Sequence, residues 1–81
     1  MLFVTFINSN PTTYNNLINL MKKLHLPDGV KIISKYVLFG KPDALIIFEA
    51  QNEINALKFV EQFVSIGDTQ THSILNVDDI K

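Results

Sequence analysis

The stretch from residue 36 to residue 50 constrains the fold most, because two apolar runs meet there across a short turn. Residues 36–39 (YVLF) are aromatic and aliphatic, and residues 44–48 (ALIIF) contain no polar side chain. Residues 40–42 (GKP) separate the two runs. Aromatic and β-branched residues favour strands, and Gly and Pro mark turns. The stretch therefore predicts a β-hairpin.

Two further strands are predicted near the ends of the chain, at residues 2–7 and 69–75. Residues 2–7 are apolar except for Thr5, and residues 44–48 are wholly apolar, which is typical of strands covered on both faces. Residues 30–39 and 69–75 carry polar side chains, as sheet edges do. The pattern thus predicts two central strands and two edge strands.

An amphipathic helix is predicted between the first strand and the hairpin. Asn10 suits the N-cap, and Pro11 suits the first helical position, where its missing N–H is not needed. Apolar residues then recur at three- and four-residue spacing, which predicts one buried helix face. These residues are Leu17, Ile18, Met21 and Leu24.

A second helix is predicted after the hairpin, with Asn52 as its N-cap. Gly67 is expected to close it as a left-handed residue after the C-cap. The predicted buried stripe consists of Ala56, Phe59, Val60, Phe63 and Val64.

The elements follow the order βαββαβ, in a single predicted domain over residues 1–81. Right-handed crossovers in this order place the first and third strands in the middle of the sheet. These are also the two strands without a polar face. We therefore expect an α+β, ferredoxin-like fold, with a four-stranded antiparallel sheet of order 4-1-3-2 and two helices on one face.

Two helices cover only one face of such a sheet, so apolar side chains on the other face of the central strands need another cover. A contiguous apolar patch of that size usually marks an interface. We predict a two-fold homodimer in which the helix-free faces of two sheets pack together.

The composition narrows the range of partners. Without cysteine the chain forms no disulfide and no thiolate metal site. The net charge of −1, the absence of arginine and the dispersed lysines argue against a nucleic-acid or anionic-membrane surface. The apolar runs are too short to span a bilayer, and residues 1–4 (MLFV) lack the features of a secretion signal. The expectation is a soluble cytoplasmic protein without cofactor or metal.

Several short segments together resemble the GYD family, small proteins of the dimeric α+β-barrel superfamily. They are Tyr36, residues 39–43 (FGKPD), 46–50 (IIFEA), 65–71 (SIGDTQT) and the opening residues 1–6 (MLFVTF). The resemblance implies a ferredoxin-like protomer and a dimeric α+β barrel. The wider superfamily contains cofactor-independent monooxygenases and small isomerases. This chain departs from the family at Pro42, which stands where a tyrosine would precede Asp43.

Asp43 and His72 are the candidate catalytic residues. Asp43 would act as a general acid or base if apolar neighbours raised its pKa, although a turn residue that accepts backbone hydrogen bonds is the commoner role. His72 is the one histidine predicted inside a strand, where it could relay protons or bind haem or a metal. No second histidine is near it, so an ordinary edge-strand histidine is the simpler interpretation.

A ligand site is predicted from Tyr36, Asp43, Thr71 and His72. Tyr36 could present its hydroxyl to a small molecule, although strand tyrosines more often pack with only the tip in solvent. The hydroxyls around Thr71 could bind a polar ligand or simply form a solvated sheet edge.

The leading functional interpretation is a homodimeric binding or interaction module that takes a small apolar or aromatic ligand. The alternative is a cofactor-independent enzyme, of monooxygenase or isomerase type, in which Asp43 or His72 moves a proton. RNA binding on the free sheet face comes last, because the central strands lack interleaved basic residues.

Overall fold

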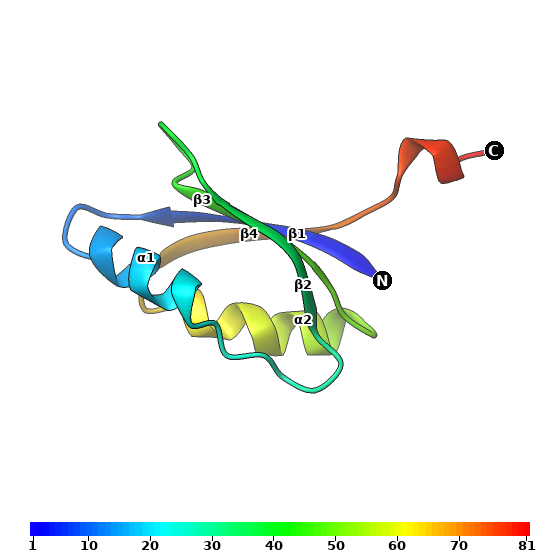
Figure 1. Ribbon diagram of the computed structural model, residues 1–81, viewed down its shortest axis with the longest axis horizontal. Helices are drawn as coiled ribbons and strands as arrows, with labels where there is room; N and C mark the ends of the chain where they lie inside the picture. The colour runs from blue at the N-terminus through cyan, green and yellow to red at the C-terminus, as the bar shows by residue number, and fades with distance from the viewer.

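The computed structural model describes residues 1–81, and its elements follow the predicted βαββαβ order (Figure 1). Short 3₁₀ turns follow the second helix and the last strand. The strands are β1 (Leu2–Ser9), β2 (Lys31–Val37), β3 (Ala44–Glu49) and β4 (Gly67–Ile74), and the helices are α1 (Tyr14–Lys22) and α2 (Glu53–Val60).

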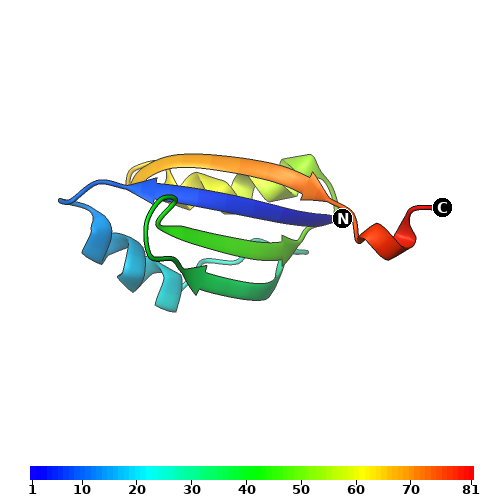
Figure 2. The same cartoon turned by 90° about the horizontal axis from the view of Figure 1, so that it is seen from above.

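The four strands form one sheet of order β2-β3-β1-β4, and every neighbouring pair is antiparallel. This is the predicted order 4-1-3-2 read from the other edge, so the ferredoxin-like fold is confirmed. Both helices lie on the same face of the sheet (Figures 1 and 2). No helix is both long enough and apolar enough to cross a membrane.

An aromatic cluster forms the centre of the core between the sheet and α2. Phe3 of β1 stacks on Phe48 of β3 with ring centroids 5.5 Å apart, and Phe48 lies 4.6 Å from Phe59 of α2. Phe59 in turn meets Phe63 edge to face at 5.9 Å. These rings and their aliphatic neighbours pack α2 onto the central strands, as the predicted helix stripe requires.

The opposite face of the sheet carries a second apolar set. Val4 of β1 pairs with Ile47 of β3, and Phe6 pairs with Leu45. Because side chains alternate between the faces of a strand, these residues point away from the core that Phe3 and Phe48 occupy. We call the set the open face; it consists of Leu2, Val4, Phe6, Leu45, Ile47 and Ile74.

The start of α1 differs from the prediction. The helix begins at Tyr14, and Asn10 instead caps a turn over residues 10–13. Its side-chain oxygen accepts hydrogen bonds from the backbone N–H groups of Thr12 and Thr13, each at 3.0 Å. The helix therefore begins three residues later than predicted, because the Asx turn at Asn10 competes with the helix for these backbone donors.

The predicted role of Gly67 was wrong. Its backbone is not left-handed; Gly29 and Gly40 are the glycines with positive φ. Gly67 begins β4 opposite Ser9, and a Cβ there would lie 1.8 Å from the carbonyl oxygen of Asn8. The glycine therefore permits a close approach of two backbones.

Two apolar residues lie farther out than predicted. α2 ends at Val60 and continues as a 3₁₀ turn, so Val64 is turned outward and is 69% exposed. Phe39, placed in a strand by the sequence, lies at the tip of the β2–β3 hairpin and is fully exposed. The prediction of a buried Val64 was thus wrong.

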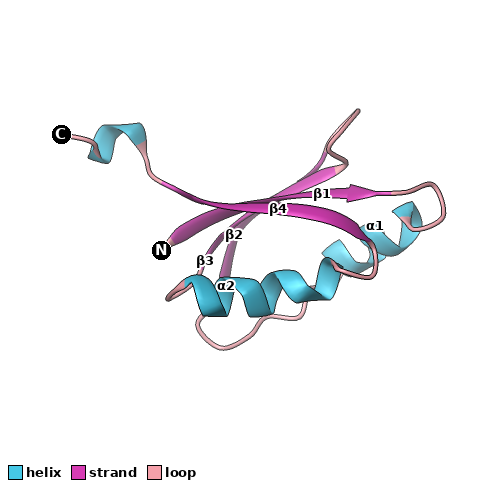
Figure 3. Ribbon diagram, turned by 180° about the vertical axis from the view of Figure 1, so that it is seen from behind, coloured by secondary structure: helices cyan, strands magenta, loops and turns pink.

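The hairpin tip and the C-terminal segment both rise on the helix-free side of the sheet, at its opposite ends (Figures 1 and 3). The C-terminal segment contains a 3₁₀ turn, Val77–Asp79, in which the Asn76 side chain accepts a hydrogen bond from the backbone of Asp78. Its side chains Leu75, Val77 and Ile80 are exposed.

Candidate functional site

The four residues predicted to form a ligand site do not gather at one place. Tyr36 and His72 point to the helix-free side, but from the two opposite edge strands. Three strand spacings of about 4.8 Å separate those strands. Thr71 points to the helix side, and Asp43 lies where the hairpin loop enters β3.

Asp43 is buried at the centre of a small polar cluster. Its Oδ2 atom accepts a hydrogen bond from the Ser9 backbone N–H at 2.8 Å and another from the Ser9 hydroxyl at 2.8 Å. The Lys41 ammonium donates to the same oxygen at 2.8 Å and also to the Ser9 carbonyl at 3.1 Å. The cluster therefore ties the end of β1 to the hairpin.

The same contacts set the charge of Asp43. The hydrogen bond from Lys41 lowers the pKa of this carboxyl below its ordinary value of 3.8; burial opposes the shift, and the Ser9 hydrogen bonds reinforce it. The carboxylate is thus ionised at neutral pH. A general base that works near neutral pH needs a raised pKa, so these contacts suit a structural role.

Thr71 is engaged inside the protomer. Its hydroxyl donates to the hydroxyl of Thr5 at 2.9 Å, and Thr5 is completely buried on the helix side of β1. This hydrogen bond satisfies the buried Thr5 hydroxyl, which lies among apolar side chains between the sheet and the helices. The Thr71 hydroxyl could therefore bind a ligand only through the hydrogen-bonding positions that the contact with Thr5 leaves free.

His72 and Tyr36 are both accessible. The His72 ring meets the Phe6 ring edge to face, with centroids 6.3 Å apart. Tyr36 on β2 is 55% exposed. No cluster of three potential metal-ligating His, Cys, Asp or Glu side chains occurs. Both aromatic rings thus border the open face from opposite edges.

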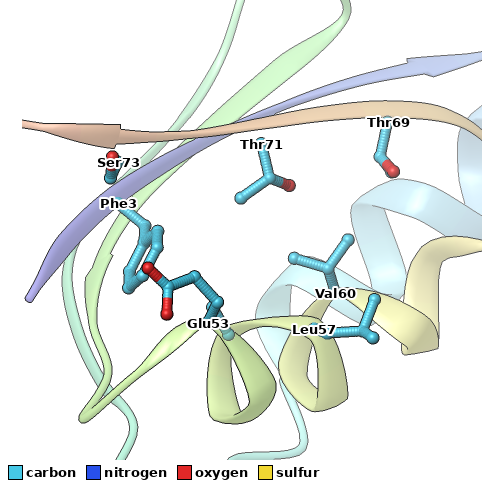
Figure 4. A pocket seen from close by; sticks show the side chains of 8 residues that line it. Phe3, Glu53, Leu57, Val60, Thr69, Thr71 and Ser73 are labelled. Atoms are coloured by element: carbon cyan, nitrogen blue, oxygen red, sulfur yellow. The ribbon is translucent and has the colours of Figure 1, made fainter.

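A partly apolar hollow lies elsewhere, between α2 and β4 (Figure 4). This α2–β4 groove has a volume of about 320 Å³. Phe3, Ala56, Leu57 and Val60 supply its apolar side, and Thr69, Thr71, Ser73 and Glu53 supply its polar side.

The sequence analysis identified Thr71 and its neighbours Thr69 and Ser73 as possible ligand contacts, but it did not identify the α2 side of the α2–β4 groove. The groove depends on the distance between a helix and an edge strand. Local periodicity does not report that distance, although the hydroxyls at alternate positions of β4 were a partial signal.

Comparison with known proteins supports the fold. No protein-family model matches the chain, and no curated protein matches it. Among solved structures, B. subtilis LrpC is similar, with a TM-score of 0.73 and 18% sequence identity. The similarity covers 99% of this chain but 54% of LrpC, so the chain spans about half the length of that protein. The chain thus shares with part of LrpC a ferredoxin-like α+β fold.

Proposed function

We propose that this chain is a homodimeric, ferredoxin-like binding module related to the GYD proteins, in which two sheets pack through their open faces. The observation that carries the proposal is the open face itself, six apolar side chains on the side of the sheet without helices. Monomeric proteins rarely expose a contiguous apolar patch larger than a few hundred Å². A second copy would cover it with an identical surface, as two-fold symmetry requires.

The charges of the helix-free side also suit a dimer. Lys31 and Glu49 lie opposite each other at one end of the β2–β3 pair, and Asp68 lies near the start of β4. The centre, around Val4 and Ile47, carries no charge. Interfaces are depleted of charge at the core and polar at the rim, and this arrangement follows that rule.

The available area is adequate for a stable dimer. Four strands about 4.8 Å apart and about 23 Å long present roughly 400 Å² in plan. The exposed ring of Phe39 adds up to about 200 Å². Leu75, Val77 and Ile80 extend the surface at the other end. Together these approach the ~800 Å² per partner of a typical stable interface.

The proposed ligand is a small apolar or aromatic molecule held at the border of the dimer interface. Tyr36 and His72 support this proposal, because a partner sheet lying on the open face would cover the inner side of both rings. Asp43 and Thr71 were predicted for the same ligand site, but they lie away from this border, because Thr71 points to the helix side and Asp43 is held by Ser9 and Lys41.

Native mass spectrometry of the purified protein tests both parts. The expected species contains two 9.2 kDa chains and an additional small molecule. The Ile47→Lys variant should give single chains, because it places an ammonium at the centre of the apolar interface. Ile54→Lys is the matched control; residue 54 is 65% exposed on α2, and this variant should remain a dimer.

A single 9.2 kDa species for the natural sequence at about 100 μM, well above the Kd of an interface of this size, would contradict the dimer. A dimer without added mass would contradict the bound ligand alone.

A further inference from the structure

The two edges of the sheet differ in how well they are protected from other chains. β2 carries Lys31 and Lys35, and its register against β3 shifts between Ile32 and Ser34. Lysines and bulges are common devices that stop an edge strand from pairing with another chain. β4 has no lysine and no proline, and its register against β1 is uninterrupted from Gly67 to Ile74. β4 is therefore the receptive edge.

The backbone of β4 has hydrogen-bonding capacity to spare. The strand pairs only with β1 and forms one edge of the sheet. In an antiparallel ladder about half of the residues turn their N–H and C=O groups away from the existing neighbour. Over the eight residues of β4, this leaves an outward row that an added strand could satisfy.

The α2–β4 groove lies directly beside this edge (Figure 4). Its floor is formed by the buried side chains of Phe3, Ala56 and Val60, and Leu57, which is 60% exposed, forms the outer wall. A strand added to β4 would point every second side chain to the helix side, as Thr69 and Thr71 do. Those side chains would enter the groove.

The charge of the groove specifies one of these side chains. Glu53 is the only charged residue that lines it, and the Glu53 carboxylate takes part in no ion pair or hydrogen bond. Figure 4 places Glu53 beside Phe3, at the Ser73 end, with Leu57 and Val60 toward Thr69. A basic side chain opposite Ser73 and apolar side chains opposite Thr71 and Thr69 would match this lining.

We propose that the outer edge of β4 and the α2–β4 groove bind an extended peptide segment of a partner protein, which joins the sheet as a fifth, antiparallel strand. Because the added strand runs opposite to β4, its sequence reads basic–x–apolar–x–apolar. Backbone hydrogen bonds provide the affinity, and the alternate side chains provide the specificity. The site is separate from the open face, so it leaves the proposed dimer interface free.

The test is an NMR titration of the ¹⁵N-labelled protein with the capped peptide acetyl-Thr-Lys-Thr-Val-Thr-Leu-Thr-amide. Saturable shifts are expected in the backbone amides of residues 67–74 and of α2, with slowed hydrogen exchange at the outward β4 amides. A peptide with Glu in place of Lys should bind about threefold to fivefold more weakly, as expected for loss of an exposed ion pair. The Glu53→Lys variant should reverse that preference.

Two further variants locate the groove. Leu57→Lys should weaken binding about tenfold by filling the groove with a charged chain. Val64→Lys, at a similarly exposed position outside the groove, should leave binding unchanged. The Ile47→Lys variant of the open face should also bind the peptide normally, which separates this site from the dimer.

Three results would overturn the proposal. They are shifts confined to β2 or to the open face, no saturable shift at millimolar peptide, and concentration-dependent protection of the β4 amides without peptide. The last would show that a second copy of this chain occupies the edge.

Discussion

Asp43 shows how a residue chosen for possible chemistry can serve the fold instead. Its carboxylate accepts three hydrogen bonds on one oxygen, two from Ser9 and one from Lys41. Sequence position was enough to place Asp43 beside a turn. It did not identify Ser9, which lies 34 residues away and comes close only through the pairing of β1 with β3.

The Asp43→Asn variant should lose about 1–3 kcal/mol of stability at neutral pH, because the amide donors of Asn oppose the Lys41 ammonium and the Ser9 hydroxyl. Folding lowers the pKa of Asp43, so the unfolded chain takes up the proton first. The carboxylate's contribution is therefore complete above the unfolded pKa and is lost as the pH falls through the lower, folded pKa. Urea unfolding at matched protein concentration measures this difference.

The difference in unfolding free energy between the natural sequence and Asp43→Asn should accordingly be smaller at pH 3 than at pH 7. Lys41 is 65% exposed, and the charge–charge part of an exposed ion pair contributes little to stability. Added salt, which screens that part, should therefore reduce only a minor part of the difference. An equal difference at both pH values would contradict the assigned contacts.

At the scale of elements, Gly67 decides whether β1 and β4 can start their pairing. Gly67→Ala places its Cβ 1.8 Å from the Asn8 carbonyl oxygen and 3.0 Å from the Ser9 Cα atom. Both neighbours are backbone atoms, which cannot yield without disturbing the ladder. We expect a loss of at least about 2 kcal/mol, measured by thermal or urea unfolding.

The neighbouring Asp68→Ala change is the control and should cost less than about 0.5 kcal/mol, as exposed positions usually do. Gly67→Asn separates the two explanations for this glycine. Asn tolerates the left-handed backbone angles found at helix ends. Gly67→Asn should therefore be more stable than Gly67→Ala only if the glycine were needed for a left-handed backbone. No rescue is expected.

The elements that were predicted well are those with strong local patterns. The apolar residues of β1 and β3 identified the central strands, and Asn52 accepts the capping hydrogen bond from Asn55 at 2.9 Å. The features that were missed arise between elements. The bulge in β2, the close approach at Gly67 and the α2–β4 groove all depend on register or spacing between segments far apart in the chain.

At the scale of the whole molecule, the exposed hairpin tip is where the proposed dimer can be tested without disturbing the protomer. Phe39 is fully exposed, so Phe39→Ser should leave the stability of an isolated protomer unchanged. In the face-to-face dimer this ring would lie against the partner. Its loss should raise the dimer dissociation constant about 10- to 100-fold, as measured by sedimentation equilibrium.

Val64→Ser removes another exposed apolar side chain, from outside the open face, and it should not change the dissociation constant. Equal weakening by both substitutions would show that the hairpin tip has no specific role in association.

The unequal edges of the sheet have a consequence for how this protein behaves at high concentration. Head-to-tail contacts that do not close on themselves build fibres, and edge-to-edge growth of a sheet needs two accepting edges on every molecule. Here the lysines and the irregular register of β2 remove one of the two. Growth by edge pairing of single protomers would therefore stop after one addition, whereas the proposed dimer presents two β4 edges and stays free of such polymers only while those edges are occupied.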